Sequence, residues 1–330
     1  MTDGTLPPDH AISRFARRHR FQPAEALPWL AAIACFFAFP DYLALGAQVL
    51  ATILFALSLD LILGYAGMVT LGHAAFFGMG AYVAGLLNTH GWTEPLTGLA
   101  AAAAGAALVG LVSGAVIIRT KALTFLMLTL VVATLLGELA NKWTSFTGGA
   151  DGLPGMKTAS VLGFRFDFFG RTAYVYCGVV LFLAWLLVRR IVHSPYGRSL
   201  TGIRENVGRM HAIGSPVFYR LLAAYAISAA LAGIAGALIT QTTQFVGLNA
   251  FSLDRSGTLL VMLIIGGVGR LYGAFIGVPL YMIFQDRFSS IDPIYWYFWM
   301  GLMLVLIVVF APGGVFGVID RLRSWRRRRA

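Results

Sequence analysis

The chain has 330 residues, of which 58% are hydrophobic and only 12% are charged, and its mean hydropathy is +0.77. Soluble domains carry about 25% charged residues, so this composition excludes a soluble domain and is typical of an integral membrane protein. A net charge of +11 would suggest nucleic acid as a partner of a soluble protein. Here the basic residues gather at both termini and between apolar runs, which favours contact with membrane lipid and no contact with nucleic acid.

The apolar residues form continuous runs, whereas the strands of a membrane β-barrel would alternate apolar and polar residues. Runs such as "AAAAGAALVG", together with 38 glycines, supply the small side chains that let membrane helices approach closely. We therefore expect an all-α helical bundle. The two cysteines, Cys35 and Cys177, each lie inside an apolar run and are expected to be buried thiols.

Ten apolar segments, bounded by charged residues, Pro or polar clusters, follow one another along the chain. They are residues 28–40, 42–63, 71–88, 95–118, 121–140, 173–191, 220–240, 257–268, 273–288 and 294–311. Because a bilayer core about 30 Å thick requires about 20 residues of helix, the first, eighth and ninth segments are short and should tilt, break or re-enter. The sequence thus predicts a polytopic bundle of about ten spans.

Arginine clusters precede the first segment and follow the last, and basic residues favour the cytoplasmic side of a membrane. An even number of spans then places both termini in the cytoplasm. This predicts a basic N-terminal segment at 1–27, a transmembrane domain at 28–312 and an Arg-rich tail at 313–330. Within the domain, the longest outer loop is expected at 141–172 and a cytoplasmic loop at 192–219.

Two Gly-rich stretches, "LGYAGMVTLGHAAFFGMGAY" and "IIGGVGRLYGAFIG", interrupt the apolar segments where one span turns into the next. In transporters, such short interrupted segments indicate broken helices that line a substrate path, and tight helix packing is the alternative interpretation. The residues expected at the path are Asp60, Gly64, Gly67, Gly72, His73, Gly266, Gly267, Gly269 and Gly273.

Three ionisable residues, Asp60, His73 and Glu138, lie within or near apolar segments. A carboxylate at the centre of a membrane costs about 2.5–3.5 kcal/mol, so Asp60 should face protein or water, as a structural group or as part of the path. His73 is either a hydrogen-bonded packing residue or a proton carrier, and Glu138 is either a solvated helix end or a functional acid. As a relay, the three residues would suit an autonomous carrier or channel.

The outer loop contains "TGGADGLPG", in which Gly and Pro154 have the turn chemistry of a compact, ordered loop. Such a loop could cap the path or receive an extracytoplasmic partner, and a plain connector is the alternative.

The polar stretch "SPYGRSLTGIRENVGRMHAIGSP" separates the sixth and seventh segments and falls on the cytoplasmic side. Its apolar residues recur at helical spacing, with charged residues opposite, which predicts one amphipathic helix over 195–214. The apolar face consists of Leu200, Ile203, Val207 and Met210, and the opposite face carries Arg198, Glu205 and Arg209.

Ser194 and Pro195 suit the N-cap and first position of this helix. Glu205 and Arg209 are spaced as a favourable i, i+4 pair. Four apolar residues make a thin face for a lipid surface, so docking of the helix on a soluble protein is favoured over a helix lying on lipid.

The stretch "SPYGRSLTGIRENVGRMHAIG" with the following "YRLLAAYAISAALAGIAGAL" resembles the cytoplasmic loop and next helix of the LivM-type permeases of branched-chain amino acid ABC importers. The segments "LILGYAGMVTLGHAAFFGMGAYVAGLL", "TGGADGLPGM" and "IIGGVGRLYGAFIG" are similar to other segments of that family, in the same order. The resemblance covers about residues 45–315, most of the chain.

The resemblance implies an ABC importer permease fold in a bacterial inner membrane and a subunit that imports branched-chain amino acids or related small polar solutes. It implies three kinds of partner: a second related permease, two cytoplasmic ABC ATPase subunits and an extracytoplasmic solute-binding protein. The chain itself would be no enzyme and would hold no cofactor or metal. ATP would be used by the ATPase subunits, in keeping with the lack of a G-x-x-x-x-G-K-[ST] motif in this sequence.

In such importers a cytoplasmic coupling helix docks on the ATPase. The residues that match it here are Pro195, Gly197, Arg198, Arg204, Glu205, Asn206 and Gly214. Three positions depart from the family pattern: Asp60 replaces an uncharged polar residue, Ala274 follows Gly273 where Pro is common, and Arg270 adds a charge to a tight turn. These departures leave the solute open among branched-chain amino acids, urea and short amides.

Overall fold

The computed structural model describes residues 23–120, 122–156, 159, 170–310 and 313–317. Most of the basic N-terminal segment, much of the outer loop and most of the Arg-rich tail lie outside these residues, so the predictions made for them stay predictions. The chain forms two compact units, Met1–Pro40 and Asp41–Ala330.

The described part of the first unit consists of η1 (Pro23–Ala26) and α2 (Leu27–Ala38). Pro28 lies in the first turn of α2, where its missing N–H leaves no hydrogen bond unmade. The apolar side chains of α2 are mostly exposed, and Cys35 is exposed as well. The expectation of a buried thiol is therefore wrong for Cys35 and correct for Cys177, which is buried.

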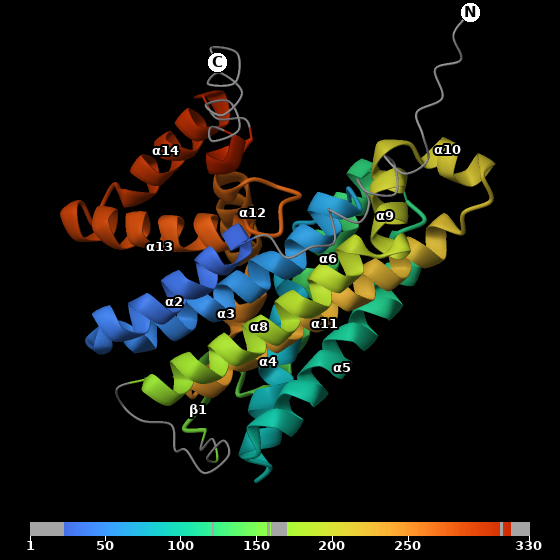
Figure 1. Ribbon diagram of the computed structural model, residues 1–330. Coiled ribbons are helices and arrows are strands. Elements are labelled where there is room, and N and C mark those ends of the chain that lie inside the picture. The colour runs from blue at the N-terminus through green and yellow to red at the C-terminus, as the bar shows by residue number, and fades with distance from the viewer. Residues whose placement is uncertain (1–22, 121, 157–158, 160–169, 311–312, 318–330) are drawn as a thin grey trace, which may run out of the picture. The chain divides into compact units, whose positions relative to one another are not determined.

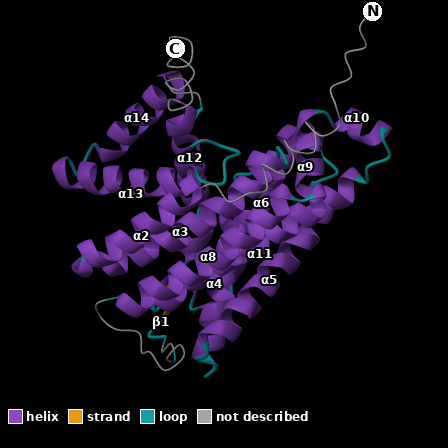
Figure 2. Cartoon of the chain, viewed as in Figure 1, coloured by secondary structure: helices purple, strands orange, loops and turns teal. Residues whose placement is uncertain are grey.

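Helices dominate the described part of the second unit, as Figure 2 shows. The α-helices are α3 (Leu43–Asp60), α4 (Ala74–Thr89), α5 (Pro95–Ile117), α6 (Ala122–Lys142), α7 (Thr144–Thr147), α8 (Arg171–His193), α9 (Pro195–Glu205), α10 (Val207–Ala212), α11 (Val217–Thr243), α12 (Leu253–Gly266), α13 (Gly273–Ile291) and α14 (Trp296–Phe310) (Figure 1). Shorter elements are η2 (Pro40–Tyr42), η3 (Leu61–Tyr65), η4 (Gly149–Asp151), η5 (Leu248–Phe251), β1 (Leu153–Pro154) and β2 (Phe245–Val246).

The predicted all-α membrane fold is confirmed, since a helix occupies each of the ten predicted apolar segments. By length and composition, 5 helices could cross a membrane: Pro40–Tyr65, Pro95–Ile117, Leu123–Lys142, Arg171–His193 and Val217–Thr243. Leu27–Ala38, Ala74–Thr89 and Trp296–Ile307 are shorter apolar helices. The total of about ten spans stays a prediction.

Helix α11 forms the centre of the second unit and packs against α3, α4 and α5. Helices α11 and α5 lie side by side (Figure 1), and small residues allow their close approach. A Cβ atom added to Gly110 would lie 2.6 Å from the Cβ of Ala229, and one added to Gly233 would lie 2.5 Å from the Cβ of Ala106. This close approach is how membrane helices gain packing energy where lipid offers no hydrophobic driving force.

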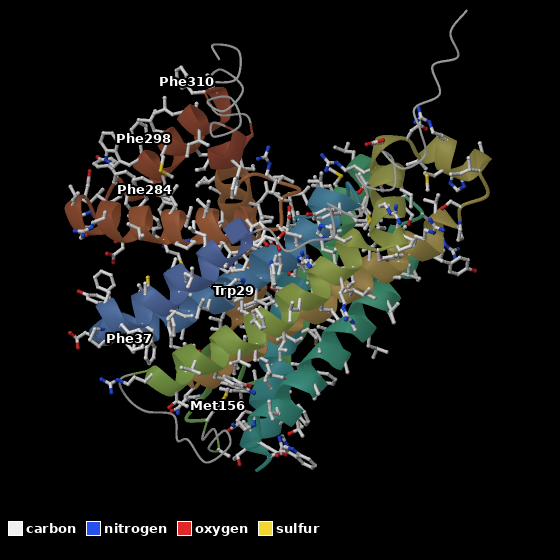
Figure 3. All side chains as sticks on the ribbon, in the orientation of Figure 1. Trp29, Phe37, Met156, Phe284, Phe298 and Phe310 are labelled. Carbon is white, nitrogen blue, oxygen red and sulfur yellow. The ribbon has the colours of Figure 1, made fainter. Side chains whose placement is uncertain are left out.

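The loop between α6 and α8 folds against the end of α11. Strand β1 pairs with β2 in antiparallel register, with Leu153 opposite Val246. Met156, labelled in Figure 3, follows β1 and is 3% exposed. The described part of the outer loop is thus compact and ordered, as its turn residues predicted.

Candidate functional site

The two Gly-rich stretches interrupt helices, as predicted, and their turns meet. Helix α3 ends at Asp60 and continues into the π-helical turn η3, after which Gly67 has φ +75°. The turn between α12 and α13 contains Gly267 with φ +110° and Gly269 with φ +77°. Positive φ angles favour glycine because other residues are strained there.

Asp60 ties one turn to the other. Its Oδ1 accepts a hydrogen bond of 2.7 Å from the backbone N–H of Gly269, and the side chain is 1% exposed. A Cβ atom on Gly64 would lie 2.6 Å from the Cα of Gly269, so the two backbones touch. Oδ2 of Asp60 is buried and has no hydrogen-bond partner within the described ranges.

Arg204 brings the cytoplasmic segment to the same place. Its guanidinium donates a hydrogen bond to the backbone carbonyl of Gly64. The position of a Cβ on Gly67 lies 2.8 Å from Cγ of Arg204, and that of Gly269 lies 3.2 Å from Nη1 of Arg204. We call Asp60, Gly64, Gly67, Arg204 and Gly269 the Arg204 junction.

Burial disfavours the charged form of Asp60, and contacts within the Arg204 junction oppose this effect. The guanidinium of Arg204 lies close enough to Asp60 to attract its carboxylate. Together with the N–H of Gly269, this attraction offsets part of the cost of burying Asp60. Of the two interpretations left open for Asp60, the geometry supports a structural tie between turns.

His73 is fully buried, and its Nε2 lies 2.8 Å from the hydroxyl of Ser58. The single hydrogen of that hydroxyl is donated to the carbonyl of Phe55, at 2.6 Å. His73 must therefore donate from Nε2, which leaves Nδ1 as an acceptor. Nδ1 has no hydrogen-bond partner among the described residues. The ring of Phe55 stacks on His73 with centroids 5.5 Å apart. These contacts favour the interpretation of His73 as a hydrogen-bonded packing residue.

The structure does not assemble Asp60, His73 and Glu138 into a relay. Gly72, which precedes His73, packs against Thr129 of α6. Glu138 lies further along the same helix, by about 13 Å at about 1.5 Å per residue, and its side chain is exposed. Glu138 is therefore set apart from His73 along α6, which removes this residue from the relay of the carrier alternative.

The remaining glycines of the second stretch hold α12 against α13. A Cβ on Gly266 would lie 2.6 Å from the carbonyl carbon of Gly273, and one on Gly277 would lie 2.8 Å from the N of Gly266. Ala274, where the family pattern has Pro, is buried at 1% exposure. These contacts explain the glycines by packing, and their place at a substrate path stays a prediction.

The cytoplasmic segment contains two helices, so the prediction of one helix over 195–214 is wrong. Asn206 has extended backbone, with φ −158° and ψ 102°, and separates α9 from α10. Its Oδ1 accepts a hydrogen bond of 2.9 Å from the N–H of Arg209 and thus caps α10. Asn favours such capped starts over helix interiors. Glu205 and Arg209 consequently lie on different helices, and their predicted i, i+4 pair does not form.

The apolar face of this segment packs mostly on other helices of the same chain. Leu200 is 0% exposed and lies against Ala66 and Ala224. Ile203 and Met210 are also buried, next to Val217. Three of the four residues of the predicted face, all except Val207, are thus covered by the chain itself, so this face is not the exposed docking surface that the spacing suggested.

The start of α9 is as predicted. Ser194 caps it, accepting a hydrogen bond of 3.3 Å from the N–H of Gly197, and Pro195 occupies the first turn. The hydroxyl of Tyr196 donates to the carbonyl of Arg220 at 2.7 Å. Burial raises the pKa of Tyr196 to about 12, so the hydroxyl keeps its proton and ties α9 to α11.

The exposed surface of the segment lies around α10. Arg209 and His211 on α10, Asn206 before it and Gly214 after it are exposed, as are Arg198, Arg204 and Glu205 on α9. Val207, Ile213 and Tyr219 add exposed apolar side chains, at 48%, 69% and 71% exposure. Periodicity assigned Val207 to the buried face and gave no role to Ile213 or Tyr219, because it assumed an unbroken helix.

Comparison with known proteins identifies the chain. The family model described as "Branched-chain amino acid transport system / permease component" matches residues 42–308. The chain belongs to this permease family. It is therefore a multi-pass membrane transport component of a family whose members are permease subunits.

The permease is similar to proteins named LivM. The "High-affinity branched-chain amino acid transport system permease protein LivM" of Salmonella typhimurium is 27% identical over 290 residues, which span 80% of this chain and 67% of the relative. The LivM of Escherichia coli gives the same figures: 27%, 290 residues, 80% and 67%. The "Probable branched-chain amino acid transport permease protein LivM" of Methanocaldococcus jannaschii is 26% identical over 312 residues, 79% of this chain and 88% of the relative. No solved structure gives a significant match.

The permease also contains a buried region that the sequence did not reveal. Arg255, in the first turn of α12, places its guanidinium 4.6 Å from the ring centroid of Phe77. The hydroxyl of Ser256 accepts a hydrogen bond of 2.9 Å from the N–H of Ala74, the first residue of α4. Arg255 was given no role from the sequence, although its position beside a short apolar segment could have indicated a re-entrant start.

Proposed function

We propose that this permease is the membrane subunit of an ATP-driven ABC importer in a bacterial inner membrane. It would form the translocation path with a second, related permease and import branched-chain amino acids or related small polar solutes. Two cytoplasmic ABC ATPase subunits would hydrolyse the ATP, and an extracytoplasmic binding protein would deliver the solute. The family and the names of the relatives support this proposal.

The observation that carries the coupling proposal is the hydrogen bond from Arg204 to the carbonyl of Gly64. It links an exposed cytoplasmic helix to the break at the end of α3. Gly64 in turn touches Gly269, whose N–H is bonded to Asp60. A displacement of α9 would thus act on both Gly-rich turns at once, which is how a packed network transmits motion between distant sites.

Helix α9 is suited to transmit such a displacement because it is held to its neighbours. Tyr196 bonds to the backbone of α11, and Leu200 and Ile203 are buried. A Cβ on Gly197 would lie 2.6 Å from the carbonyl carbon of Val192, so α9 also packs on the end of α8. These contacts favour movement of α9 together with the ends of α8 and α11.

The docking surface would be the exposed part of α10 and the turn that follows it. Exposed Val207 and Ile213 supply apolar contact, and Arg209 and His211 surround them. Such a surface suits a partner with an apolar groove and an acidic rim.

The deciding experiment reconstitutes the permease with its second permease and ATPase subunits in proteoliposomes. Binding protein loaded with L-leucine, L-isoleucine or L-valine should stimulate ATP hydrolysis, and uptake should require both ATP and the ATPase subunits. Uptake of these amino acids by the permeases alone, driven by an ion gradient, would contradict the proposal and support an autonomous carrier.

A further inference from the structure

Among the residues that the structure describes, no group of opposite charge pairs with the guanidinium of Arg255. Over the described ranges it forms neither a hydrogen bond nor an ion pair, and its contact is the face of Phe77 at 4.6 Å. The backbone N–H of Arg255 is used in capping, since it donates to the hydroxyl of Ser252 at 3.3 Å. The charged edge of the side chain is therefore left for another partner.

Arg255 is half-buried, and the aromatic ring that it contacts belongs to a buried cluster. Phe77 packs on Phe55 with ring centroids 4.6 Å apart, and both residues are 3% exposed. Phe55 lies near the middle of the candidate span Pro40–Tyr65. A charged side chain beside such a cluster is costly, and proteins keep one there where it meets an ion, a counter-charge or a solute.

The connection before α12 explains how Arg255 reaches Phe77. The residues of η5 fold inward onto α4, where Phe251 stacks on Tyr82 with centroids 5.4 Å apart. Phe251 also fills the space beside Gly78, since a Cβ there would lie 2.8 Å from its Cγ. Leu253 and Asp254 at the start of α12 are exposed, whereas Ser256 is buried and bonds the first turn of α12 to the first turn of α4.

The surroundings of Arg255 suit an anion. Helices α4 and α12 begin side by side, and the N-terminal ends of helices carry partial positive charge. The aromatic face of Phe77 holds one face of the guanidinium by cation–π attraction. This leaves the N–H groups at the edge of the guanidinium free to bind both oxygens of a carboxylate.

We propose that Arg255 binds the carboxylate of the transported solute on its way through the membrane. The proposal rests on the proposed import function and narrows it: the solute is a carboxylate such as an amino acid, and neutral solutes such as urea or acetamide are poor substrates. Arg255 is then a specificity-determining residue of the permease itself, in addition to the selection made by a binding protein.

The test uses the complete complex in proteoliposomes, with radiolabelled L-leucine and, separately, urea and acetamide. Arg255→Gln should lower leucine uptake about 10-fold or more, since a hydrogen bond to a charged group is lost, and Arg255→Lys should keep part of it. Arg287→Gln is the matched control, because Arg287 is an exposed arginine on α13. It should transport leucine as the unmodified complex does, and ATP-dependent uptake by this control shows that the complex works.

A second variant covers the case in which Arg255→Gln fails to assemble. Arg255→Cys is placed in a background with Cys35→Ala and Cys177→Ala, so that it is the reactive thiol. A thiol reagent that attaches an ammonium group should restore leucine uptake, whereas one that attaches a sulfonate should not. A purely structural role for Arg255 would not produce this dependence on the sign of the attached charge.

Two results would overturn the carboxylate site and leave the import function standing. One is leucine uptake by Arg255→Gln equal to that of the Arg287→Gln control. The other is ATP-dependent uptake of urea or acetamide, but not of leucine, by the unmodified complex. Uptake that needs no ATPase subunit would instead overturn the import function itself.

Discussion

Asp60 joins two turns that are far apart in the chain. Its Oδ1 accepts the N–H of Gly269, and the guanidinium of Arg204 attracts its charge. Oδ2 makes no hydrogen bond inside the described part of the chain. The useful property of the side chain is therefore one correctly placed acceptor oxygen, which an amide also provides.

Two variants of Asp60 should distinguish the effect of its acceptor oxygen on stability from the effect of its negative charge. Asp60→Asn keeps an oxygen for Gly269 and removes a buried charge, so its stability should be close to that of the unmodified permease. Asp60→Ala leaves the N–H of Gly269 without a partner, which costs about 1–3 kcal/mol. Thermal unfolding of the purified permease in detergent would check this order, and an Ala variant as stable as the Asn variant would contradict it.

Gly64 is the residue of the Arg204 junction least able to accept a side chain. Gly64→Ala would place a Cβ 2.6 Å from the backbone of Gly269, and such overpacking costs about 1–3 kcal/mol. Gly178→Ala is the control, since the nearest atom, Cδ1 of Leu50, lies 3.9 Å away. The midpoint of thermal unfolding should fall for Gly64→Ala and not for Gly178→Ala; equal midpoints would show that the turns can move apart.

At the scale of elements, some features of α9 and α10 could be predicted from the sequence and others could not. The spacing of Leu200, Ile203 and Met210 correctly predicted a helical face that would be covered. Periodicity cannot say what covers a face, because a helix of the same chain and a partner subunit bury the same side chains. The break at Asn206 was predictable in principle, since Asn is a frequent N-cap residue and Gly208 weakens the helix that follows.

Loss of the hydrogen bond between Arg204 and Gly64 should impair coupling to ATP hydrolysis without impairing the binding of the ATPase subunits. Arg204→Gln shortens the side chain and removes the charged donor to Gly64, so solute-stimulated ATP hydrolysis should fall about 10-fold. The ATPase subunits should still co-purify, because the docking surface around α10 is unchanged. Arg190→Gln is the control, an exposed arginine on α8. Normal stimulation of the Arg204→Gln complex would show that the hydrogen bond plays no part in coupling.

At the scale of the second unit, three contacts show which turns share one end of the helices. Gly269 bonds to Asp60, Arg204 bonds to Gly64, and Arg119 lies 5.2 Å from the ring centroid of Phe218. If the segment 192–219 is cytoplasmic, as its basic residues predict, the turns after α3, α5 and α12 lie on the same side. Hydropathy alone did not place Arg255 beside Phe77, because it marks where an apolar run begins but not that the preceding loop folds onto α4.

The segment that includes α9 and α10 has exposed and buried apolar residues, and the two kinds should respond differently to substitution. The exposed ones should affect assembly with the ATPase subunits, and the buried ones should affect folding. Ile213 is 69% exposed, so Ile213→Asp should leave the permease folded and weaken its association with the ATPase subunits. Leu200 is 0% exposed, so Leu200→Asp should instead unfold the cytoplasmic end, at a cost of several kcal/mol for an unpaired buried charge. Co-purification and thermal unfolding of both variants distinguish loss of docking from loss of fold. If Ile213→Asp keeps its ATPase subunits at full yield, docking must use the charged residues of α9, and the surface around α10 is then not the contact.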